Sequence, residues 1–211
     1  MHKFYFLSLF IFLACTTCAQ EDNKGKIDAQ RPTLTESYSI IVPNMLQFEN
    51  GVDYFEDADS FSYGTFVRGS VTNRVELRAF TDYERLNAVG AKFIAMEPDA
   101  SAFGIGASFV YSRDLSSNSD EFRVALTKDF ESFFTTYNFG YSQFIYNIAL
   151  IGIPLSDQVN YFAEYYNDPN MNRIHSGVTW IPKRDLQLDV NGGWMDSGSW
   201  YAGIGASFRL R

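Results

Sequence analysis

The stretch WYAGIGASFRL, from Trp200 to Leu210, alternates between apolar residues and residues that are small, polar or charged. Ile204 and Phe208 fall on one parity, and Arg209 falls on the other. Because successive side chains of a β-strand point to opposite faces, this alternation predicts a strand with one apolar and one polar environment. Its length suits a tilted strand that crosses a membrane. The stretch therefore predicts the last strand of a transmembrane β-barrel, from which such a barrel is assembled inward.

The same alternation recurs upstream in segments of similar length, each bounded by turn residues. We predict an all-β fold, an antiparallel transmembrane β-barrel of about 12 strands, with both barrel ends of the chain on one side. The eighth segment is apolar on both parities, so its orientation stays open. We place the strands at 45–56, 60–70, 74–83, 87–97, 102–112, 121–128, 132–142, 144–153, 158–166, 173–181, 185–194 and 200–210.

The first residues have the pattern of an export signal, with Lys3 before an apolar run at 4–14 and small residues up to Ala19. We expect cleavage after Ala19, with lipidation of Cys15 as the alternative. The apolar run is shorter than the roughly 20 residues of a spanning helix, and no later stretch approaches that length, so we expect no transmembrane helix. The predicted division is a signal peptide at 1–19, a short periplasmic N-terminal tail at 20–44 and an outer-membrane barrel at 45–211.

The composition restricts the kinds of molecule that we expect this protein to bind. The chain has a formal net charge of -8, which argues against nucleic acid because phosphate binding needs clustered Lys and Arg. A mean hydropathy of -0.16 is compatible with a membrane barrel, whose lipid face occupies only every second residue. We therefore expect export to the outer membrane of a Gram-negative bacterium, with outer-membrane lipid and the barrel-assembly machinery as partners.

Turn lengths predict which end of the barrel faces the periplasm and which end faces the outside of the cell. Even-numbered connections such as 71–73 are compact, whereas odd-numbered ones such as 113–120 and 167–172 read as longer and acidic, as expected for outer loops. A three-residue turn at 71–73 would place Arg68 directly opposite Glu76. We interpret the acidic loops as ordinary solvated charge in preference to a site for cations or lipopolysaccharide.

Aromatic residues fall near both ends of the outward-facing rows, with smaller aliphatic residues between them. Two belts of this kind are typical of a membrane barrel, whereas a soluble β-sandwich, the alternative, would not require rings at strand ends. The predicted aromatic girdle comprises Tyr54, Tyr63, Tyr83, Tyr111, Tyr141, Tyr165, Trp180, Trp194, Trp200 and Phe208.

The inward-facing rows carry charges of both signs in nearly equal number, so strong ion selection is not predicted. We favour salt bridges that brace the wall over direct solute contacts, because an unpaired charge in a narrow lumen is costly. Glycines on the same rows leave space and favour an open or partly open passage. The predicted lumen-lining residues are Glu49, Asp53, Arg68, Glu76, Arg78, Lys92, Arg123, Glu164, Asp189 and Arg209.

Several short motifs resemble a known family. RPTLTES at 31–37, RGSVTNRVELR at 68–78 and PLSDQV at 154–159, together with the final strand, are similar to the outer-membrane transporter-like β-barrel family labelled MetA-pathway of phenol degradation. The similarity covers nearly the whole chain after residue 19. It implies an outer-membrane barrel that passes small compounds, including hydrophobic or aromatic ones.

We therefore expect a porin-like channel or transporter for passive passage of small solutes, without cofactor or metal. The tail before Asn44 is long and polar enough to enter the lumen and gate it, which is a hypothesis. One alternative is a structural or adhesive barrel with a closed lumen. The other is a lipid-modifying enzyme, which would need a nucleophile such as Ser142 or Ser176 beside His175; we expect no enzymatic activity. The solute and the oligomeric state are not specified by the sequence.

Overall fold

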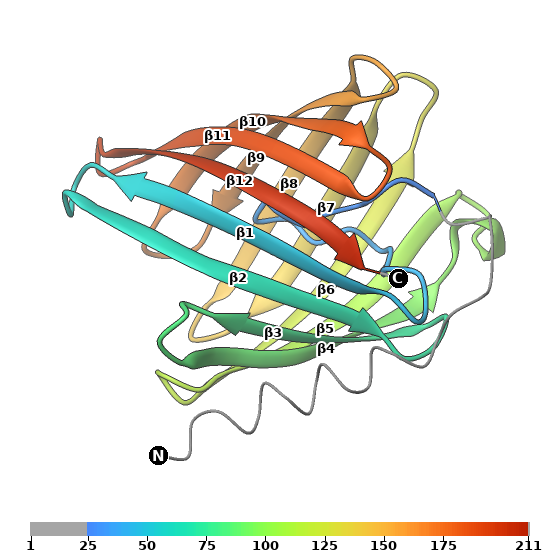
Figure 1. The fold of residues 1–211 in the computed structure, drawn as a ribbon, viewed down its shortest axis with the longest axis horizontal. Coiled ribbons are helices and arrows are strands. Elements are labelled where there is room, and N and C mark those ends of the chain that lie inside the picture. The colour runs from blue at the N-terminus through green and yellow to red at the C-terminus, as the bar shows by residue number, and fades with distance from the viewer. Residues whose placement is uncertain (1–24, 211) are drawn as a thin grey trace.

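The computed structural model describes residues 25–210, which form one closed β-barrel (Figure 1). Every strand pairs antiparallel with its sequence neighbours, and β1 closes the barrel on β12. The prediction of a 12-stranded antiparallel barrel is confirmed. The strands are β1 (Leu46–Phe55), β2 (Ser60–Ser70), β3 (Val75–Thr81), β4 (Leu86–Met96), β5 (Ile105–Asp114), β6 (Ser119–Asp129), β7 (Phe134–Tyr141), β8 (Ile145–Pro154), β9 (Val159–Asn167), β10 (Asn172–Lys183), β11 (Leu186–Met195) and β12 (Trp200–Leu210).

Burial alternates along the strands as the sequence pattern predicts. On β11, Asp189 and Asn191 are buried inside the barrel, while Val190 between them is exposed on the outside. The orientation of β8, open from sequence, is now assigned: Ile148 and Leu150 face the interior, and Ile151 faces out. Within residues 25–210, no helix is long and apolar enough to cross a membrane.

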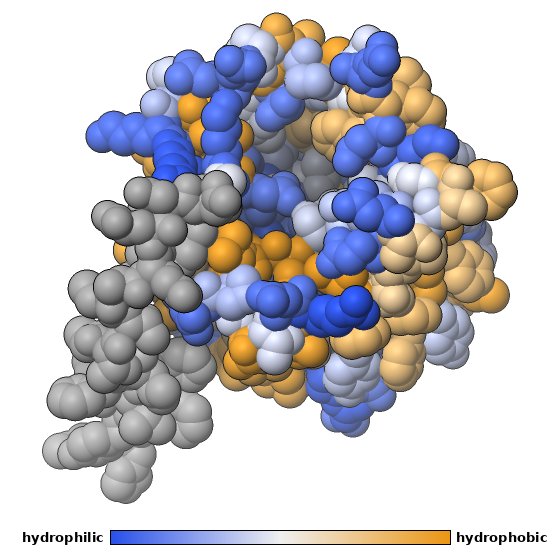
Figure 2. Space-filling model, turned by 90° about the vertical axis from the view of Figure 1, so that its right-hand side faces the viewer, coloured by the Kyte–Doolittle hydropathy of each residue, from blue (hydrophilic) through white to orange (hydrophobic). Residues whose placement is uncertain are grey.

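The barrel has two ends, which we name by the residues that lie there. We call the end with Leu46 and Leu210 the near end, and the opposite end, with the β1–β2 turn, the far end. Figure 2 looks onto the near end, where polar side chains surround a hollowed centre and apolar side chains cover the flanks. The apolar flanks are the outward rows of the strands, as expected of a barrel whose outside meets lipid.

The predicted contrast in loop length is wrong. At the far end, residues 115–118 make a tight turn in which the Asp114 carboxylate accepts hydrogen bonds from the Ser116 and Ser117 amides. This carboxylate closes the turn early, so β5 and β6 extend further than expected. The longest connection joins β4 to β5 at the near end, and contains a short 3₁₀ helix, η2 (Pro98–Ala100).

The predicted register between β2 and β3 is also wrong, by two residues. Arg68 lies opposite Arg78, and Ser70 lies opposite Glu76. The reason is a longer turn, in which the Thr72 hydroxyl accepts hydrogen bonds from the backbone of residues 74 and 75. Because the shift is even, every side chain keeps its predicted face. The long Arg68 side chain still reaches Glu76 diagonally, with a separation of 2.9 Å between Nη2 and Oε2.

The chain before β1 runs inside the barrel (Figure 1). We call residues 25–44 the plug segment. The sequence led us to expect it in the periplasm below the barrel, with entry into the lumen as a hypothesis; the structure places it in the lumen. Ile27 and Ile41 are buried at 2% and 4% exposure, and the Ile27 amide donates to the Arg184 carbonyl at the near end. The predicted signal peptide and Cys15 lie outside the described residues.

Candidate functional site

One side of the lumen wall holds a dense ionic cluster on β1 to β4. The Arg68 guanidinium bridges two carboxylates, with Nη1 2.9 Å from Glu49 Oε1 and Nη2 2.9 Å from Glu76 Oε2. The second oxygen of Glu76 lies 2.7 Å from Arg78 Nε. Lys92 is opposite Glu76 on β4 and is fully buried. We call Glu49, Arg68, Glu76, Arg78 and Lys92 the Glu76 cluster.

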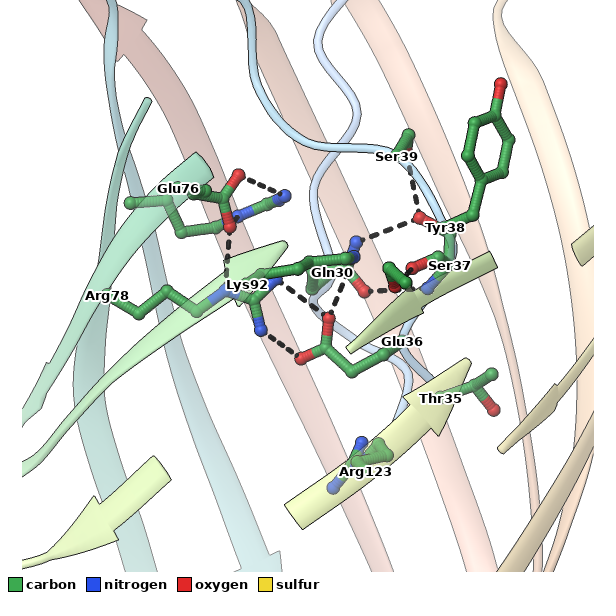
Figure 3. Close-up of polar contacts among 12 residues, drawn as sticks. Gln30, Thr35, Glu36, Ser37, Tyr38, Ser39, Glu76, Arg78, Lys92 and Arg123 are labelled. Atoms are coloured by element: carbon green, nitrogen blue, oxygen red, sulfur yellow. Dashed lines mark hydrogen bonds and ion pairs between the residues drawn. The ribbon is translucent and has the colours of Figure 1, made fainter. Parts of the chain in front are cut away.

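The plug segment completes this cluster through Glu36 (Figure 3). Glu36 Oε1 lies 2.6 Å from Arg78 Nη1, and its Oε2 lies 3.2 Å from Lys92 Nζ. Burial disfavours the ionised form of Glu36, but Arg78 and Lys92 outweigh that cost and hold the pKa of this carboxyl well below its ordinary value of 4.5. The wall therefore binds Glu36 as a carboxylate.

A second part of the lumen wall, on β1, β9 and β11, is acidic and binds Arg31 of the plug segment. Arg31 donates to both oxygens of Asp53, at 3.1 and 3.2 Å, and its Nε lies 3.5 Å from Asp189 Oδ1. The side chains of Arg31 and Asp53 keep 18% and 25% exposure, so this contact is wetter than the Glu76 cluster. We call Asp53, Glu164 and Asp189, on β1, β9 and β11, the acidic wall.

Glu164 binds the plug segment through its backbone. Its carboxylate accepts hydrogen bonds from the amides of Leu34 and Thr35, at 2.7 and 3.1 Å, and from the Thr35 hydroxyl at 2.6 Å. His175 Nδ1 lies 2.6 Å from Glu164, and its Nε2 lies 3.2 Å from Asn191 Oδ1. Both ring nitrogens of His175 therefore contact wall residues in this arrangement.

Two cavities lie within the barrel, one on each side of the plug segment. The far cavity has a volume of about 290 Å³ and the near cavity about 190 Å³. Wall residues from the far halves of the strands, such as Phe55 and Arg173, line the first, whereas Ile181 and others from the near halves line the second. Gln30 to Thr33 line both cavities. These four residues thus form the partition between them.

The inward glycines do not leave an open passage here, contrary to expectation. A Cβ at Gly106 would overlap the ring of Tyr38, and a Cβ at Gly51 or Gly205 would overlap the Arg31 guanidinium. These positions are small because plug side chains pack directly against the backbone of the wall. The sequence showed where glycines leave space inside the barrel, but not that Arg31 and Tyr38 of the plug segment fill that space.

The predicted lumen-lining residues all lie inside the barrel. Most belong to the Glu76 cluster or the acidic wall. Arg123 instead pairs with Glu121 at 2.6 Å, and Arg209, at the near end of the barrel, pairs with Asp185 at 2.7 Å. Arg31 and Glu36, which the sequence analysis left out of the site, are the plug residues whose charged side chains pair with the acidic wall and the Glu76 cluster. Their opposite charges within a polar tail were the available signal.

The predicted girdle residues lie on the outer surface. Tyr54 is half-buried there, with its ring tilted against those of Phe61 and Trp200, and the others are exposed. That they meet a membrane interface stays a prediction. Within residues 25–210, no cluster of three or more His, Asp or Glu side chains is arranged to hold a metal ion.

Solved structures share this architecture. The KdgM porin aligns with a TM-score of 0.63 over 78% of this chain and 99% of its own, at 7% identity. The NanC porin aligns with a TM-score of 0.61 over 77% of this chain and 100% of its own, at 10% identity. This is the fold of a porin barrel. Omp33 of Acinetobacter baumannii has it too, with a TM-score of 0.54 over 79% of this chain and 98% of its own, at 8% identity.

At these identities the likeness concerns the porin fold and not a shared solute. No family model matches the sequence, and no curated protein matches it. The resemblance to the MetA-pathway of phenol degradation family therefore has no support from these comparisons, which show the porin fold alone.

Proposed function

We propose that this protein is an outer-membrane channel for passive passage of small solutes, and that the plug segment is its gate. The observation that carries the proposal is the partition of the lumen. Cavities of about 290 and 190 Å³ lie on the two sides of residues 30–33, so movement of this short stretch would join them. The porin fold, with its apolar exterior, supports a place in the outer membrane of a Gram-negative bacterium.

The lining of the far cavity supports solutes with hydrophobic or aromatic parts, the class that the sequence resemblance implies. Phe55, Phe66, Phe80 and Tyr201 line it, and the rings of Phe55 and Tyr201 stack at 5.4 Å between centroids. Rings of this kind attract planar or apolar groups, while Arg173 over the Tyr201 ring adds a positive charge.

The closed structural barrel is the second candidate, favoured by the ion pairs of Arg31 and Glu36 and by the backbone contacts that hold the plug segment. A lipid-modifying enzyme is less well supported. His175 is 2% exposed and both its ring nitrogens contact Glu164 and Asn191, so it is engaged in the wall and not poised beside a serine.

Single-channel conductance of the refolded protein in planar bilayers tests the proposal. The informative variant is Arg31→Ala/Glu36→Ala, which removes the ion pairs that Arg31 and Glu36 make with the wall without substituting any wall residue. The charge-matched control is Arg74→Ala/Glu131→Ala, which removes one positive and one negative charge from exposed turn residues. We expect rare openings in the wild type and control, and frequent steady steps in the plug variant. A plug variant that folds, as judged by heat-modifiable migration, but never conducts would favour the closed barrel.

A further inference from the structure

The plug segment enters and leaves the lumen at the near end as a loop (Figure 1), with a turn at residues 30–33 and contacts between its two arms from Gln30 to Ser37 and from Asp28 to Ser39. The wall binds mainly its backbone. Side chains from strands around the barrel each hold a main-chain atom of the plug. The contacts are Glu49 with the Arg31 amide, Gln187 with the Arg31 carbonyl, Glu164 with the Leu34 and Thr35 amides, Arg123 with the Leu34 carbonyl, Asn138 with the Glu36 amide and carbonyl, Thr127 with the Tyr38 amide, Ser108 with the Ser37 carbonyl and Glu76 with the Ile41 amide.

These contacts use groups that every peptide carries. Asn138 donates to the Glu36 carbonyl at 2.8 Å and accepts from the Glu36 amide at 2.7 Å, which is how a neighbouring strand would pair with that residue. Asn138 and Glu164 are 0% and 3% exposed. Buried polar groups that lose their partners are costly, so a lumen without the plug would favour another ligand with alternating N–H and C=O groups.

Side-chain charge adds direction to this backbone recognition. Arg31 pairs with Asp53 and Asp189 on β1 and β11, and Glu36 pairs with Arg78 and Lys92 on β3 and β4. A ligand that pairs with both the acidic wall and the Glu76 cluster therefore has a basic residue and, five positions later, an acidic residue. The reverse order would place each charge against its own sign.

We propose that the lumen wall is a binding site for peptides in this looped conformation, occupied here by the chain's own plug segment. Short peptides with a basic residue and an acidic residue five positions later compete for this site, and are a solute class of the channel. This inference rests on the proposed function, because it names the solute of the same lumen. It does not need the plug sequence itself, since most of the contacts are to the backbone.

The experiment uses the full-length Arg31→Ala/Glu36→Ala protein, in which the wall is intact and the resident plug is weakened. Three synthetic peptides are compared: residues 25–41 with the natural sequence, the same peptide with Arg31 and Glu36 exchanged, and the natural peptide N-methylated at Leu34 and Thr35. The exchanged peptide keeps composition and net charge, and the methylated peptide removes only the two amides that Glu164 binds. Current interruptions report block, and anisotropy of a labelled peptide reports binding without requiring conduction.

We expect the natural peptide to interrupt the current and to bind, and the other two to bind about ten-fold more weakly, as for loss of a charge-assisted hydrogen bond. Equal block by all three peptides, or a stronger effect of an acidic oligosaccharide, would overturn the inference. Conduction without peptide binding would also overturn the peptide-binding inference but would leave the proposed channel function intact. Peptide binding without conduction would refute only the channel function. Should the double variant not fold, Gly106→Ala provides a loosened plug through Tyr38, and the same outcomes decide.

Discussion

The Glu76 cluster and the acidic wall hold the plug segment in different ways. In the Glu76 cluster, three wall cations face two wall carboxylates, all nearly or fully buried, and Glu36 supplies the remaining negative charge. On the acidic wall, three carboxylates face Arg31 and His175, and the Arg31–Asp53 contact is partly wet. The charges of the Glu76 cluster are largely paired with each other within the wall, whereas the acidic wall depends on Arg31 of the plug segment for its ion pairs.

This difference indicates which contacts are structural and which are releasable. A dry network of paired charges is expensive to disrupt, because each loss leaves another charge buried and unpaired. A contact with solvent access is cheaper to break, because water replaces the lost partner. We therefore expect the Glu76 cluster to behave as scaffold and the Arg31 contact to behave as the latch of the plug.

The largest effect should follow from Glu76→Ala. This change leaves Arg68 and Arg78 without their shared carboxylate inside the barrel, so we expect about 3–5 kcal/mol of lost stability, or failure to fold. Urea titration of the protein refolded into lipid vesicles measures it. Glu131→Ala, in an exposed turn, is the control. Wild-type stability for Glu76→Ala would erase the distinction between scaffold and latch.

Arg31→Ala should have a smaller effect on stability, about 1–2 kcal/mol, because the lost ion pairs are partly solvated. Its main consequence should be release of the plug, seen as more frequent opening in planar bilayers. Arg31→Lys should restore closure only in part, since an ammonium cannot donate to both Asp53 oxygens in the same fork. Unchanged gating in Arg31→Ala would place the latch elsewhere.

Acid should weaken the plug through Glu36. Its pKa is lowered when the plug is docked, so its contribution is complete above the ordinary value of 4.5 and is lost as the pH falls from there through the lowered pKa. We expect open probability to rise as the pH falls below about 4.5. In Glu36→Gln that rise should disappear. A change centred near neutral pH would point to a different titrating group.

Gly106→Ala should give the smallest effect, about 1 kcal/mol or less of weakened docking, because the Tyr38 ring must shift to admit the methyl group. The rate at which a cysteine placed at Ser37 reacts with a soluble thiol reagent measures plug release, in a chain with Cys15 and Cys18 replaced. Gly25→Ala is matched, since a Cβ there meets nothing within 4 Å. Equal rates for both variants would show that Tyr38 packing does not hold the plug.

Much of the barrel was predictable because strand faces follow a period of two. All twelve strands lie within about three residues of their predicted bounds, and the inward charges such as Arg68, Lys92 and Glu164 were assigned to the correct face. Turn length and register were less predictable. They depend on local hydrogen bonds such as those of Thr72 and Asp114, which composition does not specify.

The sequence by itself determined the alternation of the strands, their number and the set of charges that faces inward. Only the tertiary structure decided which charges pair and what fills the lumen. Arg31 and Glu36 have no periodic pattern of their own, and their partners Asp189 and Arg78 are distant in the chain. Such pairings arise only when barrel closure brings β1 to β12 and surrounds the plug segment, because an ionic contact depends on distance in space and not along the chain.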